Sequence, residues 1–412
     1  MLRKSPQNLI VALDVGTSKI AALVGEISSE GQIEVIGIGS HPSHGLKRGV
    51  VVNIEATVQS IQRAIEEAEL MAGCEIHSAF TGIAGNHVRS LNSHGMIAIR
   101  DKEVSSNDVE RVLDAARALA IPADQTILHI LPQEYSIDNQ EGIREPIGMS
   151  GVRLEARVHI VTGATSSAQN LTKCVERCGL QVEDMILEQL ASSQAVLTED
   201  EKDLGVCMVD IGGGTTDIAI FAGGSIRHSA VIPIAGDQVT NDIAVALRTT
   251  TKYAENMKIK YGSVLIPGTG EDTTMIEVPG ATGRPPRKFS RKMLAEVIGA
   301  RYEELFSLIH AELQRSGFGK LVASGIVLTG GASQMKGAID LAESVFQIPA
   351  RLGTPQHVKG LTDILSSPIY ATSVGLLLYS YQRQYEGRPE LIIGNSMKGM
   401  WGRIKNWFQG NF

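Results

Sequence analysis

The sequence is poor in the residues that mark several common protein classes. It has four cysteines in 412 residues, which are too few for a disulfide framework and fit a reducing compartment. Lys and Arg number 38 against 45 Asp and Glu, and the formal net charge of −7 argues against a dedicated nucleic-acid binder. No run of about 20 apolar residues occurs, so we expect a soluble or peripheral protein.

Two well-known phosphate-binding fingerprints are also missing. The sequence contains no G-x-x-x-x-G-K-[ST] string, which excludes a P-loop, and no dinucleotide-binding glycine pattern of the Rossmann type. Cys174 and Cys178 have the spacing of one helix face. The two cysteines could be a buried structural pair or half of a metal site. No nearby His or Cys completes a four-ligand set.

What is present is an ordinary globular composition, with 43% hydrophobic and 20% charged residues over a length that suggests two to four domains. Two distant segments share one pattern. The apolar run 9–13 leads into Asp14-Val15-Gly16-Thr17-Ser18, and the run 206–209 leads into residues 210–217, Asp-Ile-Gly-Gly-Gly-Thr-Thr-Asp. Each run is followed by a second apolar strand, so the sequence predicts two related lobes, each opening with a hairpin.

The glycine-rich turns of these hairpins are candidate phosphate sites. Glycine lets the backbone approach an anion closely, and successive N–H groups in a tight turn can converge on one phosphate. The first turn alone is also ordinary turn chemistry. The three glycines at 212–214 are harder to explain without a ligand, because they cost conformational entropy next to a buried strand.

A third glycine turn follows the predicted strand 325–328. It reads Thr329-Gly330-Gly331-Ala332-Ser333, and a helix is expected over about 335–345. A glycine pair before a helix N-terminus suits a ribose or a phosphate. A plain strand-to-helix turn is the alternative for this segment.

Two blocks interrupt the lobes. The block 87–163 combines strands with a helix that begins at the capping box Ser105-x-x-Asp108, which predicts a small α+β insert. The block 233–305 contains a basic segment at 284–292, with five basic residues and no acidic one. This segment is either a solvated loop or a docking surface for an acidic peptide.

The C-terminal segment is amphipathic. On a helix, its apolar side chains fall on one arc and three basic residues lie opposite, with no acid between 395 and 412. This composition is typical of a helix at a membrane surface, whereas docking on the protein's own core is the alternative. The candidate membrane-binding residues are Met397, Lys398, Met400, Trp401, Arg403, Ile404, Lys405, Trp407 and Phe408.

Taken in order, the three turns resemble the signature of the actin, Hsp70 and sugar-kinase superfamily. The resemblance implies an α/β, actin-like two-lobed ATPase fold with duplicated five-stranded sheets and flanking helices. ATP would bind in the cleft, Mg²⁺ would be held by Asp14 and Asp210 through water, and Glu188 would orient the attacking water. The implied nucleotide-binding residues are Gly16, Thr17, Ser18, Lys19, Gly212, Gly213, Gly214, Thr215, Thr216, Gly236, Glu255, Lys258, Gly330, Gly331 and Ala332.

Within that superfamily, the chain is similar over nearly its whole length to the FtsA family of bacterial cell-division proteins. Strings that carry the resemblance are Ala-Ala-Leu-Val-Gly-Glu at 21–26, Pro-Gln-Glu-Tyr at 132–135 and Gly-Arg-Pro-Pro-Arg at 283–287. The implied organisation is subdomain 1A at 1–86 and 164–205, 1C at 87–163 in place of actin's 1B, 2A at 206–232 and 306–385, 2B at 233–305, a linker at 386–395 and a membrane-targeting helix at 396–412.

The resemblance also implies partners. A member of this family would form filaments on the cytoplasmic face of the inner membrane at the division septum, and its 1C insert would recruit later division proteins. Subdomain 2B would bind the C-terminal tail of the tubulin-like protein FtsZ, with Arg284, Arg287 and Lys288 as candidate contacts. The pattern leaves open whether ATP is hydrolysed at more than a slow rate. A soluble ATPase of the superfamily and a pilus-assembly scaffold of the PilM type are the alternatives.

Overall fold

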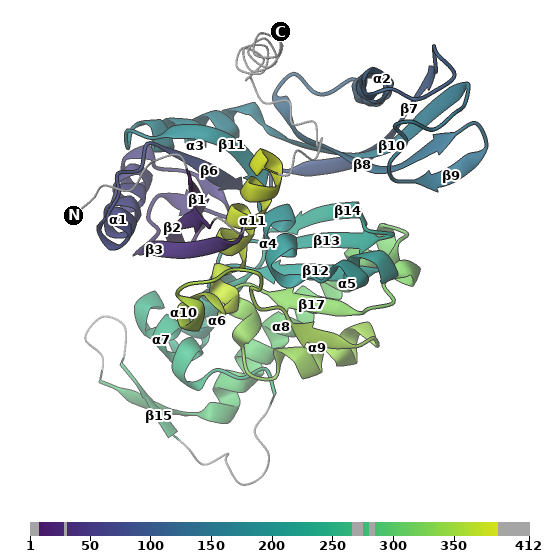
Figure 1. The fold of residues 1–412 in the computed structure, drawn as a ribbon. Coiled ribbons are helices and arrows are strands. Elements are labelled where there is room, and N and C mark those ends of the chain that lie inside the picture. Colours follow the sequence, from purple (N-terminus) through teal and green to yellow (C-terminus); the bar gives the residue numbers. More distant parts are fainter. Residues whose placement is uncertain (1–7, 29–30, 266–274, 280–284, 386–412) are drawn as a thin grey trace.

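Two sheets of the same design form the body of the protein (Figure 1). The computed structural model describes residues 8–28, 31–265, 275–279 and 285–385. The first sheet has the order β11-β6-β1-β2-β3. Its strands are β1 (Leu9–Val15), β2 (Lys19–Ile27), β3 (Ile33–Pro42), β6 (Ser78–Ile83) and β11 (Gln181–Leu187).

The second sheet repeats this topology with the order β14-β13-β12-β17-β18. Its strands are β12 (Val206–Ile211), β13 (Thr216–Ala222), β14 (Ser225–Ile232), β17 (Ile326–Thr329) and β18 (Ala350–Leu352). In both sheets an antiparallel meander is extended by two parallel strands beside its first strand. The predicted duplication is therefore confirmed at the level of strand order.

Helices cover the sheets. The helix α1 (Ile54–Ala72) starts at the Asn53 cap and ends where Gly73 adopts a left-handed φ of 67°. The other long helices are α3 (Thr165–Glu176), α6 (Gly236–Leu247), α7 (Thr251–Tyr261), α8 (Arg291–Arg315) and α9 (Ala338–Phe346). The short elements are β4 (Leu46–Lys47), β5 (Val50–Val51), α5 (Glu199–Leu204), β15 (Met275–Val278), β16 (Arg287–Ser290) and α10 (Thr362–Leu365).

The insert has a sheet and a hydrophobic core of its own. Its strands β7 (Arg89–Ala98), β8 (Gln125–Ile137), β9 (Gln140–Ile143) and β10 (Arg153–Ala164) form an antiparallel sheet, and α2 (Ser106–Arg117) packs on it. The predicted capping box is present, since Ser105 and Asp108 satisfy each other's backbone N–H groups. The expected α+β character is confirmed.

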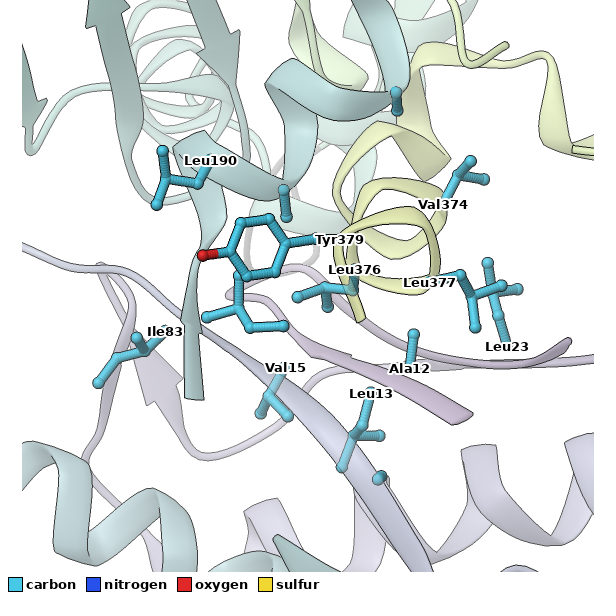
Figure 2. Packing of buried hydrophobic residues seen from close by; sticks show 14 of the residues in the cluster. Ala12, Leu13, Val15, Leu23, Ile83, Leu190, Val374, Leu376, Leu377 and Tyr379 are labelled. Atoms are coloured by element: carbon cyan, nitrogen blue, oxygen red, sulfur yellow. The ribbon is translucent and has the colours of Figure 1, made fainter. Parts of the chain in front are cut away.

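Two helices pack together beside the first sheet. α4 (Glu188–Val196) lies against α11 (Ala371–Tyr385), and α11 also contacts β1 and β2. Figure 2 shows Leu376 and Leu377 of α11 near Ala12 and Leu13 of β1. The expected boundaries placed all of 306–385 in the second lobe. In the structure, the apolar side chains of α11 are buried against the first lobe.

Two other elements of the second lobe have bounds that differ from the expected residue ranges. α8 runs without interruption through residue 305, where a boundary between subdomains was expected. The helix expected from about 335 begins only at Ala338, because Gly337, after the 3₁₀ turn over Gly331–Gln334, has a left-handed φ of 80°. Among the described helices, none combines the length and apolar composition that crossing a membrane requires.

Candidate functional site

The two predicted turns have the same backbone geometry. Asp14 and Asp210 each stand one residue before the end of a buried strand, β1 and β12. Each turn is closed by the same hydrogen bond: the N–H of Gly16 donates to the Lys19 carbonyl at 3.1 Å, and the N–H of Gly212 donates to the Thr215 carbonyl at 3.0 Å. The two lobes therefore present matching hairpin tips.

The two tips face each other closely. A Cβ atom added to Gly213 would lie 1.8 Å from the Ser18 hydroxyl oxygen, and one added to Gly214 would lie 2.6 Å from that of Thr17. Only glycine fits at Gly213 without a shift of its surroundings. Within the described residues, the N–H groups of Gly213 and Gly214 donate to no backbone carbonyl. This turn thus offers bare backbone donors to an anion, and the opposite turn adds hydroxyl groups.

Hydroxyl groups from α4 and α11 hold both aspartates. Ser192 and Thr372 donate to the same Asp210 oxygen at 2.5 and 3.2 Å, and Ser373 donates to Asp14 at 2.8 Å. Sequence reasoning missed these three residues. Adjacent buried hydroxyls in otherwise apolar helices were the available signal, but the carboxylate partners of Thr372 and Ser373 lie more than a hundred residues away in the chain.

The carboxyl groups of this site outnumber the cations near them, and burial disfavours their charged forms. Burial raises the pKa of Asp210, and burial together with Asp210 raises the pKa of Asp217 to about 8. One oxygen of Asp217 is buried without a hydrogen-bond partner, and Lys19 pairs with Asp14 at 3.3 Å. A divalent cation fits here, because it would compensate buried negative charge.

The described residues hold no cluster of three metal-ligating side chains. Asp14 and Asp210 would therefore supply only part of a coordination shell. Mg²⁺ commonly binds in this way, with one or two carboxylates and the remaining ligands from water and phosphate oxygens. The donor set agrees with a metal that arrives together with a polyphosphate.

The third turn adjoins the second. Gly330 has a φ of 85°, and a Cβ atom there would lie 2.3 Å from an Asp210 oxygen. Gly236 lies near both Ala332 and Lys258: a Cβ on Gly236 would be 3.4 Å from the Ala332 Cβ and 3.5 Å from the Lys258 Nζ. The loop at Ala332 and the first turns of α6 thus meet beside the phosphate hairpins.

α7 completes this part of the site. The Lys258 ammonium donates to the Gly236 carbonyl at 3.0 Å and pairs with Glu255 at 2.8 Å, and Thr240 of α6 also contacts Glu255. The chain therefore brings Gly236, Glu255, Lys258 and Ala332 into one cluster, as a nucleoside site would require.

Glu188 is the first residue of α4 and is partly buried. It lines a small cavity together with Gly49, Gly82 and His87. Burial and then the charges of the neighbouring aspartates raise its pKa well above the usual value. A carboxyl in this position can hold a water molecule on the side of the phosphate turns.

The remaining predicted residues lie apart from this cluster. Arg287 and Lys288 are on β16, where Arg287 donates to the Leu247 carbonyl at 3.2 Å and Lys288 stands opposite Glu277 of β15. Arg284 and the candidate membrane-binding residues 397–408 lie outside the described residues.

Solved structures with a similar fold come from several protein classes. The chain matches the PilM-PilN type IV pilus biogenesis complex with a TM-score of 0.66, at 16% identity, over 90% of this chain and 98% of that one. It matches MreB 5 of Spiroplasma citri bound to AMPPNP with a TM-score of 0.58, at 16% identity, over 98% of this chain and all of the other. At this identity, these matches show the actin-like fold and no more.

Family models and sequence relatives identify the family, which the structural matches do not. The model "Cell division protein FtsA" matches residues 207–375, and the model "SHS2 domain inserted in FTSA" matches residues 85–162. The chain is 64% identical to the cell division protein FtsA of Pseudomonas aeruginosa over 98% of both chains, and 45% identical to that of Escherichia coli over the full length of both. Similarity of this extent shows that the chain belongs to the FtsA family of cell-division proteins.

Proposed function

We propose that this chain binds ATP with Mg²⁺ between its three glycine turns and acts as an actin-like filament of bacterial cell division. The observation that carries the nucleotide site is the pair of opposed hairpin tips, with bare glycine amides on one side and the hydroxyls of Thr17 and Ser18 on the other. Bound Mg²⁺ would neutralise charge on the phosphates. Asp14 and Asp210 would hold the ion, and Gly236, Lys258 and Ala332 would border the nucleoside.

Glu188 has a separate role in this proposal. It orients a water molecule for attack on the terminal phosphate. Burial and the neighbouring aspartates raise the pKa of Glu188, and a cation bound nearby would favour its ionised form. Glu188→Ala should abolish any ATP hydrolysis and leave ATP affinity nearly unchanged. Glu183→Ala, an exposed acid on the preceding strand, is the control. An unchanged hydrolysis rate in Glu188→Ala would remove this role.

The cellular role proposed here is to tether the FtsZ ring to the inner membrane and to recruit later division proteins through the 1C insert. Family membership supports it, as does the aromatic and basic pattern of residues 396–412. One such helix would bind reversibly, and many on one filament would bind far more tightly through effective concentration. Among the described residues, we propose Lys288, which is exposed on β16, as the main contact of the FtsZ tail.

Co-sedimentation with anionic liposomes tests this role. Full-length protein should pellet, and more so with Mg-ATP, whereas Trp401→Glu should stay in solution. Asn406→Glu is the matched control, since it adds the same charge on the predicted polar side of the helix. If Trp401→Glu still pellets, another surface binds the membrane. If the wild type never pellets, the soluble ATPase and the pilus scaffold become the better readings.

A further inference from the structure

A short hairpin next to the phosphate turns has two consecutive residues with positive φ. β4 and β5 are joined by Arg48 and Gly49, whose φ angles are 51° and 75°. Two central residues with positive φ define a turn for which Asn-Gly or Gly-Gly is favoured. An arginine in the first of these positions is unusual. Strained residues of this kind concentrate at ligand sites, where other contacts hold them in place.

The hairpin tip contacts both phosphate turns. The N–H of Gly49 donates to the Thr17 hydroxyl at 3.0 Å. A Cβ atom on Gly214 would lie 3.0 Å from the Cα of Arg48, and one on Gly49 would lie 2.8 Å from the Cα of Gly85. The hairpin tip is therefore packed closely between backbone segments. This packing holds the Cα of Arg48 beside the two phosphate turns.

Arg48 differs from Lys19 and Lys258 in that no other described residue pairs with its guanidinium. Lys19 pairs with Asp14 and lies 5.0 Å from the centre of the Tyr370 ring, and Lys258 pairs with Glu255. Arg48 is exposed, and none of the ion pairs and hydrogen bonds found in the described part of the chain involves its guanidinium. A guanidinium matches phosphate oxygens with two parallel donors, so this side chain suits an anion that arrives from outside.

The position of the β4–β5 hairpin indicates which phosphate of a bound nucleotide Arg48 would contact. Gly49 and Glu188 line the same small cavity, so the hairpin tip lies on the side where the proposed attacking water would stand. In the proposed ATP site, that side would face the terminal phosphate. We propose that Arg48 binds the terminal phosphate of ATP and makes the site prefer ATP over ADP. This inference rests on the proposed ATP site.

The test is equilibrium binding of Mg-ATP and Mg-ADP to the full-length chain, measured by calorimetry. Arg48→Gly removes the charge and relieves the positive φ, so the turn should fold at least as well. We expect about tenfold weaker ATP binding and a change of less than about twofold for ADP, the size of one charge-assisted contact. Lys47→Gly is the matched control, because it removes the neighbouring exposed cation and should leave both affinities unchanged. Arg48→Lys should retain part of the preference.

The outcomes separate the two proposals. Wild-type protein that binds neither nucleotide would overturn the ATP site itself. Wild-type protein that binds both, with Arg48→Gly showing the same ATP-to-ADP ratio, would overturn the role of Arg48 alone. Equal weakening of both nucleotides would also overturn it, because the residue would then only support the turn. Should Arg48→Gly fail to fold, Arg48→Asn supplies the same measurement with a side chain that tolerates this φ.

Discussion

The two phosphate hairpins are the same turn made with different residues. In the first lobe, Asp14 pairs across the strands with Ala21, and in the second, Asp210 pairs with Asp217 at the equivalent register. Both turns span four residues and close with one N–H to carbonyl bond of nearly equal length. The first turn reads Gly-Thr-Ser-Lys and the second Gly-Gly-Gly-Thr.

The residues of the two turns complement each other across the site. Ser18 and Thr17 of the first turn stand over Gly213 and Gly214 of the second, so side-chain donors on one lobe meet bare backbone on the other. The charges also differ. Asp14 pairs with the cation Lys19, whereas the described side chains that donate to Asp210 are neutral hydroxyls, and a second acid, Asp217, lies opposite it. A duplicated fold has thus become one asymmetric site.

The largest effect should come from filling the space between the tips. Gly213→Val would place a branched side chain where even a Cβ lies 1.8 Å from the Ser18 hydroxyl. The tips must separate, and the loss of about two charge-assisted contacts to a phosphate should weaken ATP binding by about 100-fold. Gly319→Ala, where the nearest atoms are 3.6 Å away, is the control for calorimetry. An unchanged ATP affinity in Gly213→Val would mean that the two hairpin tips do not bind the same ligand.

The second acid of the second hairpin should make stability depend on pH. The folded-state pKa of Asp217 is raised to about 8, so the folded chain keeps a proton that the unfolded chain releases above about pH 4. The contribution of this group to stability should therefore be greatest below about pH 4 and fall towards pH 8, by up to about 1.4 kcal/mol per pH unit.

Urea denaturation at pH 5, 6 and 7 measures this slope. Asp217→Asn should flatten it, because the amide does not titrate, and the first lobe has only Ala21 at this position. Asp124→Asn, at an exposed acid, should keep the wild-type slope. The same slope in Asp217→Asn and wild type would assign the pH dependence to other groups.

The smallest effect concerns the hydroxyl groups that hold the two aspartates. Ser192→Ala leaves Asp210 with Thr372 as its one remaining hydroxyl donor, and should cost about 2 kcal/mol of unfolding free energy. Ser373→Ala should cost about 1 kcal/mol, because Asp14 keeps Lys19. Ser380→Ala is the control, since that buried hydroxyl bonds a carbonyl of its own helix. Equal costs at Ser192 and Ser373 would contradict the division of charge described above.

Local patterns predicted much of this architecture. The turn glycines and the Ser105 capping box depend on residues within a few positions of one another, so the sequence alone was sufficient. The position of α11 was not predictable in the same way, because its apolar face would suit either sheet. Ser373 and Asp14 are 359 residues apart, and the strained turn at Arg48 shows no Asn-Gly signal that would mark it.

Hydrogen exchange of the full-length chain with and without Mg-ATP tests most directly whether the two hairpins form one site. If they do, backbone amides in residues 14–19 and 212–217 should both exchange more slowly when Mg-ATP is present, while the insert sheet at 125–137 serves as an internal reference. Protection of only one hairpin, or of neither at saturating nucleotide, would contradict the account of a clamp shared by the two lobes.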